Sequence, residues 1–132
     1  MHVLKFGGSS VANSANIKLI TDIFLHHSAP SKLVVVSALG GITDQLIACG
    51  QMAEAGDEGF LKILKLIEKR HIDTTRELLP VQNQSACLSV VKQLCNELEG
   101  ICEGVFHLQE LSMRSKDRIS SYGELLSSKI IA

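Results

Sequence analysis

The sequence contains no tryptophan and few aromatic side chains of any kind, which make up 4% of its 132 residues. Apolar residues still make up 45% of the chain, so a hydrophobic core must be built mainly from aliphatic side chains. No apolar run is long enough to span a bilayer, and the first residues lack the pattern of a secretory signal. These absences predict a soluble, cytoplasmic protein with no membrane partner.

An excess of charge of either sign is also missing. Lys and Arg number 13, Asp and Glu number 14, and the two kinds are interleaved along the chain. A basic patch that would bind nucleic acid is therefore not expected. The four cysteines, Cys49, Cys87, Cys95 and Cys102, show no C-x-x-C pair and no zinc-ligand spacing. We predict small core thiols in a reducing compartment and no metal site.

A glycine pair follows the first apolar segment. Residues 2–6 predict a strand, and apolar spacing over 13–26 predicts a helix, so Gly7 and Gly8 fall at a strand-to-helix turn. Glycines let backbone N–H groups approach a phosphate, the helix start adds donors, and Lys5 supplies a mobile positive charge. This combination would stabilise a transferring phosphoryl group.

The same residues admit a purely structural explanation. Ser9 or Ser10 could cap the following helix, with Lys5 reaching solvent from an ordinary tight turn. Spacing alone leaves the two explanations equally open.

A second strand and a second glycine pair come next. The β-branched run at 33–37 predicts a buried parallel strand, so the chain begins with a βαβ unit. Lys5 and Ser37 lie at the carboxyl ends of the two strands, where ligands gather in parallel sheets. Gly40, Gly41 and Thr43 then repeat the order of glycines, hydroxyl and helix. Two such turns could line one cleft, although Thr43 could also be a helix cap.

Residues 57–108 predict two helices divided at Pro80. They carry no obvious chemistry. His71 lies on the apolar side of the first of them, which favours a hydrogen-bonded core histidine over a catalytic one.

The last segment, 115–132, predicts an amphipathic helix with Glu124 away from its apolar stripe. The neighbours of Glu124 three and four positions away are all small hydroxyl residues: Ser120, Ser121, Ser127 and Ser128. Together with Gly123 they leave room for a ligand, whose ammonium group Glu124 could bind, or for a close helix crossing. The apolar pattern still continues at Ala132, so we expect the 132 residues to be a fragment of a longer chain.

Three motifs resemble those of aspartokinases, in the same order. KFGGSSVA at 5–12 resembles the opening signature, with Ser9 where threonine is usual, and SALGGITD at 37–44 resembles the second glycine loop. SSYGELLS at 120–127 resembles the Gly-Glu helix of the family. Kinases of acetylglutamate, glutamate and uridylate share only the first turn. LSMRS at 111–115 also resembles aspartokinases fused to homoserine dehydrogenase.

The resemblance implies a fold and a reaction. The fold is a three-layer α/β/α sandwich with a mainly parallel sheet, of the amino-acid kinase or carbamate kinase type. The reaction uses ATP and Mg²⁺ to phosphorylate the side chain of L-aspartate to 4-phospho-L-aspartate, for lysine, threonine and methionine synthesis. Lys5 would be catalytic, and Lys5, Gly7, Gly8 and Ser9 would line the phosphoryl path.

On the acceptor side, the resemblance implies that Ser37, Gly41, Thr43 and Glu124 bind aspartate, Glu124 through the amino group.

Residues 1–132 would then be the first part of a kinase domain: a βαβ start over 1–56, a mainly helical part over 57–108 and the Gly-Glu helix over 109–132. The full-length protein would be a homo-oligomer, and this fragment alone would be inactive. The alternative is a non-catalytic module that uses the same turns to bind an anion or amino acid, or for assembly.

Overall fold

Two parallel strands and five helices make up the chain, and the computed structural model describes all of residues 1–132. The elements are β1 (His2–Phe6), α1 (Ser14–His26), β2 (Lys32–Val36), α2 (Ile42–Glu54), α3 (Phe60–Leu78), α4 (Val81–Leu108) and α5 (Met113–Ile131). Every element predicted from the sequence is present, and the protein is of the α/β class. No helix combines the length and apolar character needed to cross a membrane.

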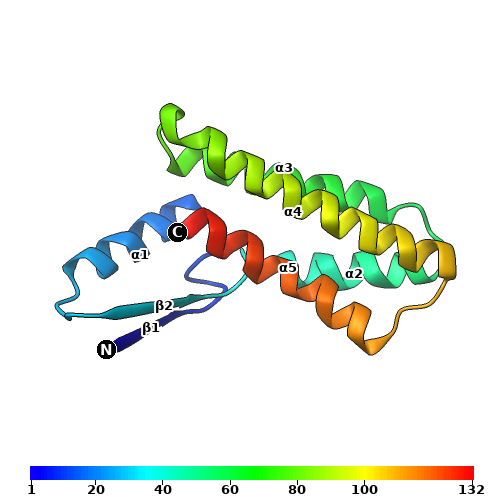
Figure 1. Ribbon diagram of the computed structural model, residues 1–132, viewed down its shortest axis with the longest axis horizontal. Helices are drawn as coiled ribbons and strands as arrows, with labels where there is room; N and C mark the ends of the chain where they lie inside the picture. The colour runs from blue at the N-terminus through cyan, green and yellow to red at the C-terminus, as the bar shows by residue number, and fades with distance from the viewer.

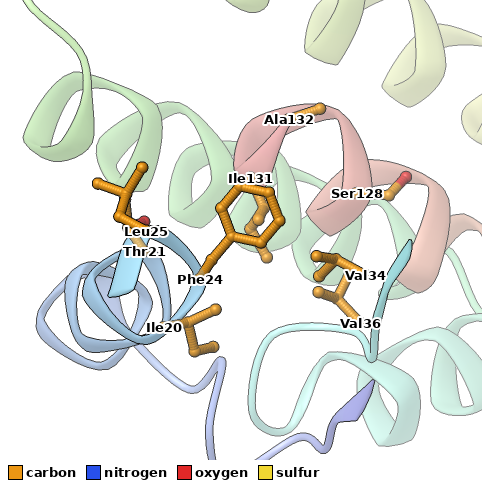
Figure 2. A pocket seen from close by; sticks show the side chains of 9 residues that line it. All are labelled: Ile20, Thr21, Phe24, Leu25, Val34, Val36, Ser128, Ile131 and Ala132. Atoms are coloured by element: carbon orange, nitrogen blue, oxygen red, sulfur yellow. The ribbon is translucent and has the colours of Figure 1, made fainter. Parts of the chain in front are cut away.

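The sheet forms the predicted βαβ unit. β1 and β2 pair in parallel, from His2 opposite Lys32 to Phe6 opposite Val36, and α1 is the crossover between them (Figure 1). Apolar residues of α1, including Ile20 and Phe24, face Val34 and Val36 of the sheet across a pocket (Figure 2). The carboxyl ends of the two strands therefore lie side by side, as the sequence predicted.

The expectation that the second strand is buried on both faces is wrong. Leu33 and Val35 are 50% and 40% exposed, and Val3 of the neighbouring strand is 61% exposed. Val34 and Val36, which point to the opposite face, lie against α1 and the end of α5. Helices cover only one face of this two-stranded sheet, so alternate side chains of the apolar run at 33–36 stay in solvent.

The remaining helices pack together into one cluster. α3 and α4 run antiparallel, joined at Pro80, and α2 and α5 lie against them (Figure 1). One face of α4 is buried, with Cys95 and Cys102 in the core as predicted. Burial raises the pKa of the Cys49 and Cys95 thiols to about 12 and that of Cys102 to about 11. These thiols stay protonated and unreactive at neutral pH.

His71 is completely buried in α3, but it is only half satisfied. Its Nδ1 lies 2.7 Å from the Ile67 carbonyl oxygen, whereas its Nε2 has no hydrogen-bond partner. A carbonyl only accepts, so Nδ1 carries the proton and Nε2 is a bare acceptor. Burial lowers the pKa of this histidine, against an opposing effect of the Ile67 hydrogen bond. The predicted core position is confirmed, but the predicted full hydrogen bonding is wrong.

Candidate active site

The two loops that leave the carboxyl ends of the strands meet at one edge of the sheet. The Ser37 amide donates to the Phe6 carbonyl over 3.1 Å, which keeps the chains together just past the last strand pair. A methyl group built on Gly8 would lie 3.9 Å from the Ala38 oxygen. The first loop (residues 7–13) and the second loop (residues 37–41) are thus neighbours, and α5 crosses beside them (Figure 1).

The first loop is closed by its own hydrogen bonds. The amides of Ser10 and Val11 both donate to the Gly7 carbonyl, over 3.0 and 3.3 Å. The side-chain amide of Asn16 then donates to the Ser9 carbonyl over 3.0 Å, tying the loop to α1.

The first helix begins later than the turn chemistry suggested. Asn13 is its N-cap, and the Asn13 side chain accepts from the Asn16 amide over 2.9 Å. Neither Ser9 nor Ser10 caps it, so that explanation of the serines is wrong. α1 begins at Ser14, six residues after Gly8. The N–H groups at the start of the helix therefore cannot act as donors at the glycine pair itself.

Backbone donors are nevertheless available at this turn. The amides of Gly7, Gly8 and Ser9 donate to no carbonyl or side chain of the protein. Lys5, exposed at the end of β1, forms no ion pair. Three successive free N–H groups, in a loop that begins two residues after a lysine without an ion pair, are suited to an anion such as phosphate.

Gly7 itself has no structural reason to be glycine. Its φ is not positive, and a methyl group built on it would meet no atom within 4 Å. Neither packing nor backbone conformation therefore explains why residue 7 is glycine. A ligand that lies against the backbone would explain it, because a side chain would then be in the way.

In the second loop, glycine is required. Gly41 has a φ of 80°, in the left-handed region, and is the N-cap of α2. A methyl group on Gly40 would lie 3.1 Å from the Cβ of Ala12, so this glycine lets the two loops touch. Thr43 is not the cap: it lies exposed in the first turn of the helix, with its hydroxyl unbonded. The alternative role of Thr43 as a cap is therefore wrong.

The small residues of α5 allow a close approach to the second loop. A methyl group on Gly123 would lie 2.7 Å from the Cβ of Ala38, and the buried Ser127 hydroxyl donates to the Ser37 carbonyl over 2.7 Å. Gly123 and Ser127 thus serve close packing, the second of the two roles open to this face. Glu124, next to them, is exposed, and its carboxylate has no hydrogen bond or ion pair.

Arg70 of α3 also belongs to this region, and sequence reasoning missed it. Its guanidinium donates from Nη1 to the Gly40 carbonyl and, over 2.6 Å, from Nη2 to the Ala12 carbonyl. It therefore bonds to both loops at once. Nothing in the helical pattern of residues 57–108 distinguished it from the exposed Lys69 beside it.

The chain has no cluster of three or more His, Cys, Asp or Glu side chains that could hold a metal ion. The side chains around the loops therefore do not form a Mg²⁺ site by themselves. An apolar pocket of about 400 Å³ lies between α1, β2 and the end of α5 (Figure 2). None of the predicted site residues lines it.

A two-stranded α/β unit whose strand ends carry paired glycine loops and a lysine without an ion pair, with the exposed Glu124 on a neighbouring helix, is suited to a protein that handles phosphate groups. The chain belongs to the Amino acid kinase family, which matches residues 1–132.

Its similarity within that family is to aspartokinases. It is 34% identical to Aspartokinase 1, chloroplastic, of Arabidopsis thaliana, over 98% of this chain and 22% of that protein. It is 28% identical to the bifunctional aspartokinase/homoserine dehydrogenase 2, chloroplastic, of the same plant, over 98% of this chain and 14% of that protein. The chain thus spans about a fifth of the first relative's length and less of the second.

Solved structures of aspartokinase III from E. coli share the fold. The complex with lysine and aspartate in the T-state matches with a TM-score of 0.85 and 27% identity, over 99% of this chain and 28% of that one. The complex with aspartate and ADP in the R-state matches with a TM-score of 0.84. The predicted resemblance to aspartokinases is confirmed.

Proposed function

We propose that the protein transfers the γ-phosphoryl group of ATP to the side-chain carboxylate of L-aspartate, giving 4-phospho-L-aspartate and ADP. The observation that carries the proposal is the set of three free amides, Gly7, Gly8 and Ser9, in the loop that follows Lys5, whose ammonium group has no ion pair. The E. coli relative, solved with aspartate and ADP, supports aspartate as acceptor and ATP as donor.

On the donor side, Lys5 and the amides of the first loop would neutralise the phosphoryl oxygens as charge spreads over them in the transition state. Phosphoryl transfer needs in-line positioning and charge stabilisation more than a covalent nucleophile. The backbone N–H groups of the first loop would supply the positioning, and Lys5 would supply the charge stabilisation.

On the acceptor side, Glu124 would bind the ammonium group of aspartate. Its carboxylate is exposed and has no partner in the protein, so a ligand cation would not displace an existing bond. Ser37, the Gly41 amide and the Thr43 hydroxyl would bind the remaining polar atoms. The close packing of Gly123 on Ala38 supports this role, because Glu124 is the next residue along α5.

Several features of the whole protein belong to the same proposal. Residues 1–132 are the first part of the kinase domain, and we expect this part alone to be inactive, since it spans 22% of a relative's length. Mg²⁺ would arrive with ATP. The full-length protein would be a homo-oligomer without nucleic-acid or membrane partners. A cytoplasmic location stays a prediction, because the plant relatives are named chloroplastic.

The test is an acyl phosphate assay on the product of the complete gene, with ATP, Mg²⁺ and hydroxylamine, comparing L-aspartate with L-glutamate and acetylglutamate. Aspartate-dependent hydroxamate is expected. Lys5→Ala should lower kcat by roughly 100-fold, because a charge that stabilises the transition state is removed. The matched control is Lys18→Ala, an exposed lysine of α1, which should behave as wild type.

Two results would contradict the proposal. If no carboxylic acid yields hydroxamate, the kinase proposal is wrong and the alternative of a non-catalytic binding module takes its place. Calorimetric titration with phosphate and aspartate would then measure what the loops bind. If Lys5→Ala and Lys18→Ala are equally active, the catalytic role of Lys5 is wrong.

A further inference from the structure

Arg70 is the single side chain that hydrogen-bonds to both loops. It projects from the middle of α3, is half-buried, and donates to the Gly40 and Ala12 carbonyls. The two acceptors belong to different loops, and each of these loops contains proposed ligand-binding residues: Gly7, Gly8 and Ser9 in the first, Ser37 and Gly41 in the second. The relative position of the loops thus depends on a residue outside both of them.

The chemistry of arginine suits this bridge. A guanidinium is planar, permanently charged and carries several N–H donors in a fixed fork, so one side chain can hold two carbonyls in a defined geometry. Hydrogen bonds from a charged donor are also stronger than those between neutral groups. A lysine ammonium on its flexible chain would keep the charge but lose the fork.

The bridge also sets the direction of a proposed ligand-binding amide. All peptide bonds of the chain are trans, so the carbonyl of one residue and the N–H of the next point in opposite directions. Arg70 binds the Gly40 carbonyl, and the Gly41 N–H therefore points away from it. That N–H has no partner within the protein.

A second contact anchors the same helix to the start of α1. Glu77, two helical turns beyond Arg70 and on the same face of α3, accepts from the Ser14 hydroxyl over 2.5 Å. α3 therefore holds the first loop at Ala12, the start of α1 at Ser14 and the second loop at Gly40.

We propose that Arg70 is a positioning residue: it fixes the first loop against the second so that donor phosphate and acceptor carboxylate are correctly aligned. This inference rests on the proposed function. Small misplacements of reacting groups are costly, because an error of about 1 Å can lower a rate by about 100-fold. Loss of the bridge should therefore lower kcat, with KM for each substrate changing much less.

The experiment compares Arg70→Gln with Lys69→Gln in the product of the complete gene. Both variants remove one positive charge from adjacent positions of α3, but only the first removes the bridge. Arg70→Gln should lower kcat by roughly 10- to 100-fold, and Lys69→Gln should match wild type. Arg70→Lys should resemble Arg70→Gln, since restoring charge without the fork does not rebuild the bridge.

Amide hydrogen exchange supplies a readout that does not depend on activity. The amides of Ser10 and Val11 close the first loop, and the Ile42 amide closes the second by donating to the Leu39 carbonyl over 3.0 Å. In Arg70→Gln, exchange should accelerate at both loops together, while amides in the middle of α4 keep their wild-type rates.

The inference is overturned if Arg70→Gln and Lys69→Gln have the same kcat. It is also overturned if amide exchange in α4 accelerates as much as exchange in the loops, because the variant is then destabilised as a whole. If the wild-type protein makes no hydroxamate, the proposed function fails. The exchange rates then test by themselves whether Arg70 holds both loops. Faster exchange in only one loop, or in neither, would show that it does not.

Discussion

A substitution at Gly7 can distinguish a ligand-binding role of this residue from a structural one. Neither φ nor packing requires glycine there, so Gly7→Ala should change the free energy of unfolding by less than about 1 kcal/mol. A methyl group facing a bound phosphate would still obstruct it. We expect kcat/KM for ATP to fall by roughly tenfold or more, measured in the hydroxamate assay beside urea denaturation.

Gly41→Ala is the matched comparison. At a φ of 80° an L-residue is strained, so this variant should lose about 1 kcal/mol of stability. If Gly7→Ala instead loses stability and keeps its activity, the first glycine is structural and the ligand explanation is wrong.

Among the elements, α5 makes the contact most sensitive to volume. A methyl group on Gly123 would lie 2.7 Å from the Ala38 Cβ and 3.3 Å from a Leu46 methyl carbon. Gly123→Ala should therefore destabilise by about 1–3 kcal/mol through overpacking, although alanine is the better helix former. Thermal or urea unfolding of the purified protein measures the effect.

Gly100 of α4 provides the control. It is exposed in the helix, and a methyl group there would meet nothing within 4 Å. Gly100→Ala should stabilise by about 0.5–1 kcal/mol. Equal and small effects of the two substitutions would show that α5 can move away from the second loop without cost.

The elements were predictable because their signals are local. Short apolar and β-branched runs identified both strands, helical apolar spacing identified all five helices, and the resemblance identified the three motifs. What failed depended on tertiary neighbours. The exposure of Val35 follows from helices covering one face of the sheet only. The predicted range of α1 was right to one residue, but its cap is Asn13 and neither Ser9 nor Ser10. Arg70 was invisible because a bridge between loops has no sequence period.

For the whole molecule, buried His71 makes stability depend on pH. Burial lowers its pKa in the folded state below the usual 6.5, and the unfolded chain titrates near that usual value. Above about pH 6.5 both states are neutral and no penalty arises. As pH falls through that value the unfolded state binds the proton more readily than the folded state, so stability is lost, by at most about 1.4 kcal/mol one unit lower.

Denaturation at pH 7.5 and 5.5 would measure this loss, with His71→Leu and His107→Gln compared. His71→Leu removes the titrating group and should flatten the dependence, whereas exposed His107 should not matter. An equal loss in wild type and His71→Leu would assign the acid sensitivity to other groups.

The way α3 and α4 are joined has a consequence for the order of folding. Their connection at Leu79 and Pro80 is short, so their mutual contacts close a small loop and can form early. The two strands can pair only after the α1 crossover brings them together. This parallel pairing is expected to form more slowly than the contacts between α3 and α4. The glycine loops depend on that pairing, on docked α5 and on Arg70. On refolding, the recovery of ligand binding should therefore lag behind the recovery of helix content.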